Sequence, residues 1–300
     1  MFRRLAARFA PIRAPTRVLR CAAAPKPPPV SAVNVEEFTL NPEVVERDMA
    51  AAKRWMALGE SLTAHKKAND NAAIVDTIQS GFALLKELGE DAAPVNCEPM
   101  LLMELALAEL NDGRAKEALA AAEKARALHE AVKPSPDEAQ LGEIREFCAF
   151  ATLASGEALA AKEQFDALIN WIDVGSSKAM PMVRVAAKAQ RRTCVMGRGL
   201  ALLEMGSSPG AADKTGVVSK AVDDLIASLS EHLEEGDNVS ARRTLGGIAR
   251  SFEVLGDGKQ AVGAAMKLAR LCERNDDAAG AADAKAWETR LRTQFGVKDE

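Results

Sequence analysis

Apolar positions along the chain recur at helical spacing, and small residues are prominent among them. In "LNDGRAKEALAAAEKARAL", residues 110–128, Ala118, Ala122 and Ala125 follow one another at intervals of three or four. This spacing places side chains on one face of an α-helix. Alternating β-branched runs long enough for a sheet are absent from the sequence, and helix-forming residues dominate it. The pattern therefore predicts an all-α protein.

Glycines divide these apolar segments at recurring positions. A Gly at the end of one segment is followed five residues later by an Ala in the next, at Gly113 and Ala118, Gly156 and Ala161, and Gly256 and Ala261. Gly adopts the left-handed backbone conformation that ends many helices. Gly206 predicts a further helix end, followed by a longer loop and a helix near Val217. With "WMALGESL" and a helix at about residues 72–88, the chain is predicted to form five helical hairpins.

These hairpins resemble tetratricopeptide repeats. Trp55, Leu58, Gly59 and Leu62 match the spacing of the first helix of such a repeat, and the fifth hairpin supplies Leu245, Ile248, Ala249, Phe252, Gly256, Ala261 and Leu268. The steps of 43 and 50 residues between glycines exceed the family's 34-residue period, so the likeness is to a divergent form. The resemblance, over residues 44–275, implies a right-handed superhelix, an α-solenoid, in which small residues let helices approach to about 8–10 Å. Trp287, Leu291 and Phe295 predict a C-terminal capping helix.

Charge is divided unevenly along the chain. The chain has 300 residues, with 39 basic and 43 acidic side chains, and residues 1–35 contain seven of the basic ones and none of the acidic ones. Phe2, Leu5, Phe9 and Ile12 share one helical face in this Arg-rich segment. Such a segment is typical of a mitochondrial transit peptide, predicted over residues 1–24, and a basic tail that binds nucleic acid or a membrane is the alternative. A Pro-rich linker over residues 25–43 and a repeat domain over residues 44–300 follow. We expect a mitochondrial protein, most simply of the matrix, without a transmembrane segment.

Residue types that carry chemistry are sparse. The chain has five cysteines, none within four residues of another, and we expect those beyond Cys21 to be buried small side chains. The three histidines, His65, His129 and His232, lack the spacing of a zinc site, and we expect them at the surface or at helix ends. "GDGKQA" and "GAADKTG" lack the strand and the glycine spacing of nucleotide-binding loops. We therefore expect no catalytic residues, no metal, no cofactor and no small-molecule substrate.

One group of basic residues stands out. No acidic residue occurs between Asp173 and Glu204, and the resemblance implies that basic helices of adjacent units line a concave groove. The candidate partner-binding residues are Lys178, Arg184, Lys188, Arg191, Arg192, Arg198, Arg242, Arg243 and Arg250. Such a groove would bind carboxylates of a protein or phosphates of RNA. The alternative is a surface neutralised by acids such as Asp223, Asp224 and Glu231.

Two functional hypotheses follow. The first is a non-catalytic scaffold or adaptor subunit that holds protein partners in a larger mitochondrial assembly, such as a respiratory or ATP synthase complex. The second is an RNA-associated protein of the mitoribosome or of RNA processing, which would use the basic groove. Aromatic residues that could stack on bases do not interleave with these arginines, which favours the protein partner.

Overall fold

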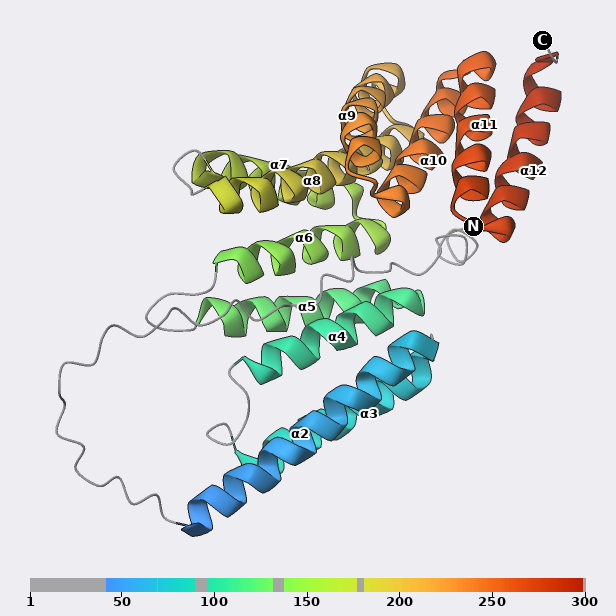
Figure 1. Ribbon diagram of the computed structural model, residues 1–300. Helices are drawn as coiled ribbons and strands as arrows, with labels where there is room; N and C mark the ends of the chain where they lie inside the picture. Colours follow the sequence, from blue (N-terminus) through green and yellow to red (C-terminus); the bar gives the residue numbers. More distant parts are fainter. Residues whose placement is uncertain (1–41, 69, 90–95, 132–137, 177–180, 299–300) are drawn as a thin grey trace. The chain divides into compact units, whose positions relative to one another are not determined.

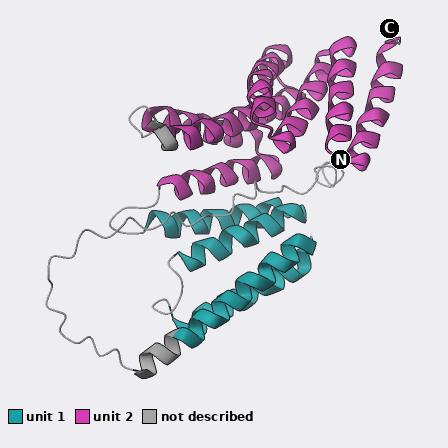
Figure 2. Cartoon of the chain, viewed as in Figure 1, with its two compact units in different colours: residues 1–134 teal, residues 135–300 magenta. Residues whose placement is uncertain are grey.

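The computed structural model describes residues 42–68, 70–89, 96–131, 138–176 and 181–298 (Figure 1). Every regular element within these ranges is an α-helix, as the periodicity predicted. The chain divides into two compact units, residues 1–134 and 135–300 (Figure 2). The predicted transit peptide, residues 1–24, and nearly all of the linker lie outside the described residues.

Unit 1 contains two helical hairpins. Its helices are α2 (Pro42–Ala68), α3 (Asn71–Leu88), α4 (Cys97–Asn111) and α5 (Ala115–Glu130). Each packs on the next along the chain. Ala118, Ala122 and Ala125 on α5 are 0% exposed, so the alanine face predicted from the sequence is the face packed within the unit. A methyl group in place of a larger side chain lets neighbouring helices approach closely.

Unit 2 contains three further hairpins and a final helix. Its helices are α6 (Glu138–Ala154), α7 (Ala158–Ser176), α8 (Pro181–Ser207), α9 (Lys214–Glu234), α10 (Asn238–Leu255), α11 (Gly258–Arg274) and α12 (Ala278–Phe295). Besides the contacts between consecutive helices, α8 contacts both α6 and α10. The first helices of the three hairpins therefore lie in the order α6, α8, α10. Helix α12 packs on α11 through Leu291 and Trp287.

Glycine positions confirm most of the predicted helix ends. Gly113, Gly156 and Gly256 have φ angles of 77°, 93° and 80°, in the left-handed region. Helix α8 ends at Ser207, one residue after the predicted end at Gly206, but Gly206 is still helical and is buried. A Cβ atom there would come within 2.4 Å of Val218, so this Gly serves a close helix contact instead of a left-handed cap. The turn after α8 instead contains Gly210, with φ 87°.

Aspartate side chains begin five of the described helices. Each carboxylate accepts a hydrogen bond from the backbone N–H three residues further on, at Asp70, Asp213, Asp237, Asp257 and Asp277. An N-cap of this kind stabilises a helix by about 1 kcal/mol. These caps and the left-handed glycines fix where each helix begins and ends.

Candidate functional site

Helices α8 and α10 carry the candidate basic residues that lie in the described part of the chain. Lys178 lies outside the described residues, and Arg184 is exposed near the start of α8. The remaining candidates are on α8 (Lys188, Arg191, Arg192, Arg198) and α10 (Arg242, Arg243, Arg250). Because α8 contacts α10, the two groups lie on adjacent helices.

Arg198 has the most complete set of partners in this group. Its Nε and Nη2 atoms each donate to Asp224 on α9 at 2.7 Å, and its Nη1 donates to Asp166 on α7 at 3.1 Å. Hydrogen bonds to Asp224 raise the pKa of Arg198 above its ordinary value. This side chain therefore joins three helices and has little capacity left for an external ligand.

Other candidate arginines are paired in the same way. Arg191 donates to Asp173 at 2.7 Å, Arg242 pairs with Asp277, and Arg250 pairs with Glu204. Arg192 is buried, with its Nη1 donating to the carbonyl of Glu231 at 3.4 Å. Acids of neighbouring helices, Asp224 and Glu231 among those expected, thus neutralise much of the predicted groove.

Arg243 differs from these arginines. Its guanidinium lies 5.8 Å from the ring centroid of Phe150, on α6, in a cation–π contact. Burial lowers its pKa, and the negative charge of Asp237 acts in the opposite direction. No carboxylate among the described residues forms an ion pair with it. Lys188 is 63% exposed and reaches Glu231 only at 4.0 Å, so these two cations retain the most capacity for a ligand.

A second arginine also stacks on an aromatic ring. Arg145 on α6 lies 5.7 Å from the ring centroid of Trp171. The neighbouring Glu146 contacts Gln190 on α8, and burial raises the pKa of this carboxyl to about 8. The sequence pattern gave no signal for these groups, since neither the rings nor the glutamate fall within the run of basic residues.

Cysteines and histidines occupy structural positions. Cys97, Cys148, Cys194 and Cys272 are free and buried, as expected, and burial raises the pKa of the Cys194 thiol. His129 and His232 lie in the last turns of α5 and α9, which confirms the helix-end prediction, but both are fully buried. The ring of His232 lies 3.2 Å from the carboxylate of Asp237, the N-cap of α10, so it helps to join α9 to α10.

The two loop motifs have structural roles. Gly256 ends α10, and the carboxylate of Asp257 occupies the N-terminus of α11 in "GDGKQA". Asp213 does the same for α9 in "GAADKTG". A carboxylate already bound at a helix N-terminus competes with a phosphate for the same N–H groups. These geometries explain both motifs as helix caps.

Comparisons with known proteins leave the chain without an assigned family. No protein-family model matches it, and no curated protein does so either. Among the described residues, no group of histidine, cysteine and acidic side chains could hold a metal ion. No described helix is both long and apolar enough to cross a membrane.

Proposed function

We propose that the chain is a non-catalytic mitochondrial adaptor whose helical hairpins form a right-handed, tetratricopeptide-like superhelix that binds a protein partner. The observation that carries this proposal is the succession of α6, α8 and α10, which places Arg243 and Lys188 on adjacent first helices of hairpins. Superhelices of this kind bind partners along their first helices, as the resemblance implies.

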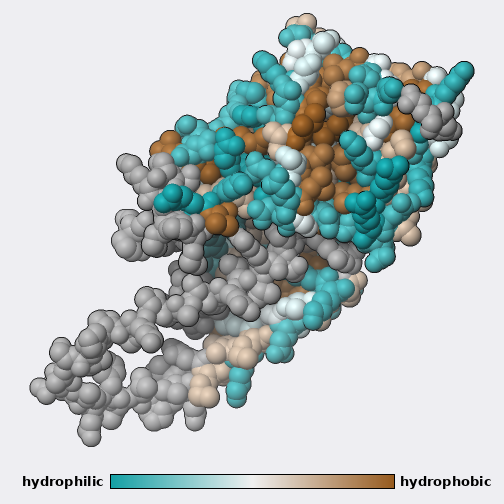
Figure 3. All heavy atoms as spheres, turned by 45° about the horizontal axis from the view of Figure 1, so that its top comes forward, coloured by the Kyte–Doolittle hydropathy of each residue, from teal (hydrophilic) through white to brown (hydrophobic). Residues whose placement is uncertain are grey.

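A protein is favoured over RNA as the partner by the state of the basic residues. RNA binding needs many unpaired cations, because each neutralised phosphate contributes to the affinity. Arg191, Arg198, Arg242 and Arg250 are already paired with carboxylates of the chain. In the upper part of Figure 3 an apolar strip lies between bands of hydrophilic residues, a combination that suits a protein interface.

The proposed protein partner presents an acidic side chain to this face. A carboxylate of the partner would pair with Lys188 or with the guanidinium of Arg243, which Phe150 holds from one side. A half-buried guanidinium gives a stronger and more directional bond than an exposed ammonium group. We therefore expect Arg243 to contribute more to affinity and Lys188 more to the rate of association.

Photocrosslinking in isolated mitochondria tests this function. A photoreactive amino acid replaces Lys188 on α8, and in a matched control it replaces Lys220, which is exposed on α9. We expect a defined crosslinked protein from position 188 that is absent from position 220 and weakened by Arg243→Gln. A product removed by nuclease would assign the face to RNA, and equal products from both positions would contradict the proposal. If the chain fails to enter mitochondria, the proposed location is wrong.

A further inference from the structure

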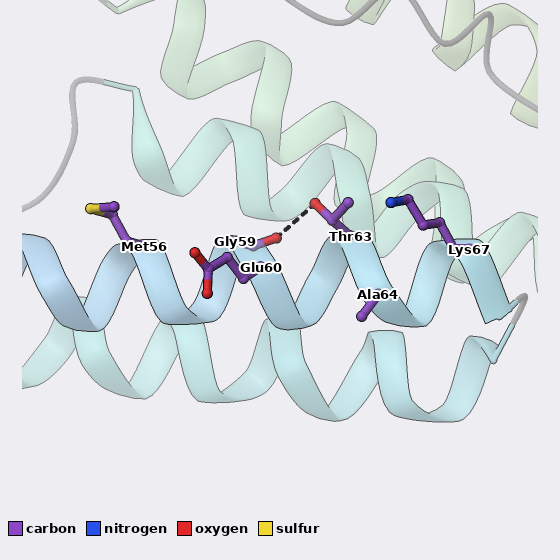
Figure 4. Close-up of a pocket in the computed structure, with 6 residues that line it drawn as sticks. All are labelled: Met56, Gly59, Glu60, Thr63, Ala64 and Lys67. Atoms are coloured by element: carbon purple, nitrogen blue, oxygen red, sulfur yellow. Dashed lines mark hydrogen bonds between the residues drawn. The ribbon is translucent and has the colours of Figure 1, made fainter.

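Helix α2 has two different apolar faces. The inner face carries Trp55, Leu58 and Leu62, which pack against the core of unit 1. The outer face carries Met49 and Met56, which are 56% and 66% exposed. A shallow hollow on this face is lined only by residues of α2, namely Met56, Gly59, Glu60, Thr63, Ala64 and Lys67 (Figure 4). Within the described residues, no other helix covers the outer face.

The outer face follows the seven-residue repeat of a coiled coil. Met49, Met56 and Thr63 are seven residues apart, and Ala52 and Gly59 each follow a methionine by three. Figure 4 shows Met56 and Thr63 projecting from the same side of α2. Positions with this spacing form the contact line between two paired helices. Helix α2, at 27 residues, is long enough for such pairing.

Gly59 lies at the centre of this face. A Cβ atom built there would meet nothing within 4 Å, so packing inside the chain does not explain the glycine. A glycine inside a helix costs about 1 kcal/mol relative to alanine, and close approach of another backbone is one physical reason for it. The Thr63 hydroxyl donates to the Gly59 carbonyl at 2.8 Å, which leaves no unpaired hydroxyl donor on the contact line.

Charges beside the contact line are complementary to those of a second copy in antiparallel orientation. Lys53 and Glu60 follow Met49 and Met56 by four residues, are exposed, and form no ion pair among the described residues. In an antiparallel pair of α2 helices, Lys53 of each copy meets Glu60 of the other. The same register places Met56 opposite Gly59, large against small, on both sides of the twofold axis.

We propose that α2 pairs with α2 of a second copy, so that the protein is a homodimer joined through its first described helix. The pairing buries both exposed methionines and uses the open backbone at Gly59. It is independent of the partner-binding face on α8 and α10, because all the residues involved lie on α2.

Charge exchange tests the pairing directly. The full chain is measured by sedimentation equilibrium, and we expect a dimer at micromolar concentration. Lys53→Glu brings two carboxylates, those of positions 53 and 60, together at each of the two equivalent contacts of the dimer. The dissociation constant should therefore rise by about tenfold or more. The double variant with Lys53→Glu and Glu60→Lys restores both pairs and should restore dimerisation. Lys116→Glu, an exposed change on α5, is the matched control.

Three results would overturn the proposal. The first is a wild-type chain that is still monomeric at about 100 times the micromolar concentration used. The second is a Lys53→Glu variant that is as dimeric as the Lys116→Glu control. The third is a double variant that stays monomeric although circular dichroism shows its native helix content. If only a chain lacking residues 1–41 dimerises, the outer face belongs to the N-terminal segment, and the proposal for the full chain is wrong.

Discussion

Both compact units bury alanines at their helix contacts, but most of the largest fully buried side chains lie in unit 2. In unit 1 the fully buried side chains include Ala118 and Ala122 on α5 and the larger Ile78 on α3. Unit 2 buries Phe165, Met196 and Leu225 at 0% exposure, and Phe165 makes an edge-to-face contact with Phe150, with ring centroids 4.9 Å apart. Larger buried side chains remove more apolar area from water, so the core around Phe165 gains more from burial than the alanine contacts of α5.

Exposed ion pairs occur in both units, but the most enclosed ones among the described residues lie in unit 2. In unit 1, Arg54 and Glu87 pair with side chains 48% and 58% exposed. In unit 2, Arg198 and Asp224 pair with side chains 28% and 16% exposed. Exposed pairs contribute little to stability because water and salt screen them, whereas enclosed pairs are costly to break. Unit 2 therefore contains the ion pairs that are most costly to break, and unit 1 carries the helix face with the most exposed methionines.

The largest expected effect tests the difference in core packing. Phe165→Ala should lower the free energy of unfolding of unit 2 by about 4 kcal/mol, because it leaves a cavity beside Phe150. The matched change in unit 1 is Phe82→Ala, at a partly buried position, and we expect about half that loss or less. Urea unfolding followed by the fluorescence of Trp171 for unit 2 and Trp55 for unit 1 measures both. Equal losses would contradict the comparison.

Removal of the enclosed arginine tests the difference in ion pairing. Arg198→Ala should destabilise unit 2 by about 2 kcal/mol, because Asp224 and Asp166 lose their common cation. Arg54→Ala in unit 1 should produce little measurable change. Thermal unfolding in low and high salt distinguishes the two, since only an exposed pair is strongly screened. A loss at Arg54 as large as that at Arg198 would show that exposure does not decide the outcome.

A pH titration should separate the units further. The pKa of Glu146 is raised to about 8 by burial, with Glu143 acting in the same direction and the hydrogen bond from Gln190 against it. Between these two pKa values, the folded state keeps the proton, whereas the unfolded chain, with a Glu pKa of about 4.3, has released it. Stability of unit 2 should fall as pH rises from about 5 to 8.

The variant Glu146→Gln isolates this group. It should be more stable than the wild type at pH 8 by about 1 kcal/mol, because partial exposure lets water moderate the penalty, and it should show a smaller difference at pH 5. Unfolding of unit 1, followed at Trp55, serves as the internal control. An unchanged pH profile in the variant would rule out Glu146 as the source.

The smallest expected effect is at the outer face of α2. This effect is measured in the Lys53→Glu variant, which is expected to be monomeric. There, Met56→Gln should change the free energy of unfolding by no more than about 0.5 kcal/mol, because the Met56 side chain is 66% exposed. Chemical unfolding of the single and double variants measures this difference. A loss above about 2 kcal/mol would mean that Met56 is part of the folded core of unit 1.

Sequence periodicity predicted the helices and most of their ends, because both depend on residues close together in the chain. The helix end at Gly206 was predicted to within one residue, but the role of this Gly was not, since a glycine can cap a helix or allow a close contact, and only the position of Val218 distinguishes the two. The pairing of Arg198 with Asp224 joins residues 26 positions apart, and Arg243 meets Phe150 from another hairpin. Such partners depend on how hairpins pack, which local patterns do not encode.

The outer face of α2 was not predicted from the sequence, for a different reason. Its inner residues, Trp55, Leu58 and Leu62, supply the repeat-like spacing and account for one stripe of the helix. Met49 and Met56 form a second stripe on the opposite side, visible only after the first has been assigned to the core. The signal that would have revealed it is the seven-residue interval between exposed apolar residues.

Helix packing between elements that are consecutive in the sequence has a consequence for how the chain folds. Within each unit, each helix packs against the next one along the chain, so little loop-closure entropy is lost at each step. Topologies dominated by such local contacts form in microseconds to milliseconds. A hairpin such as α10 and α11 can therefore assemble as soon as both of its helices have left the ribosome, before the rest of the chain exists.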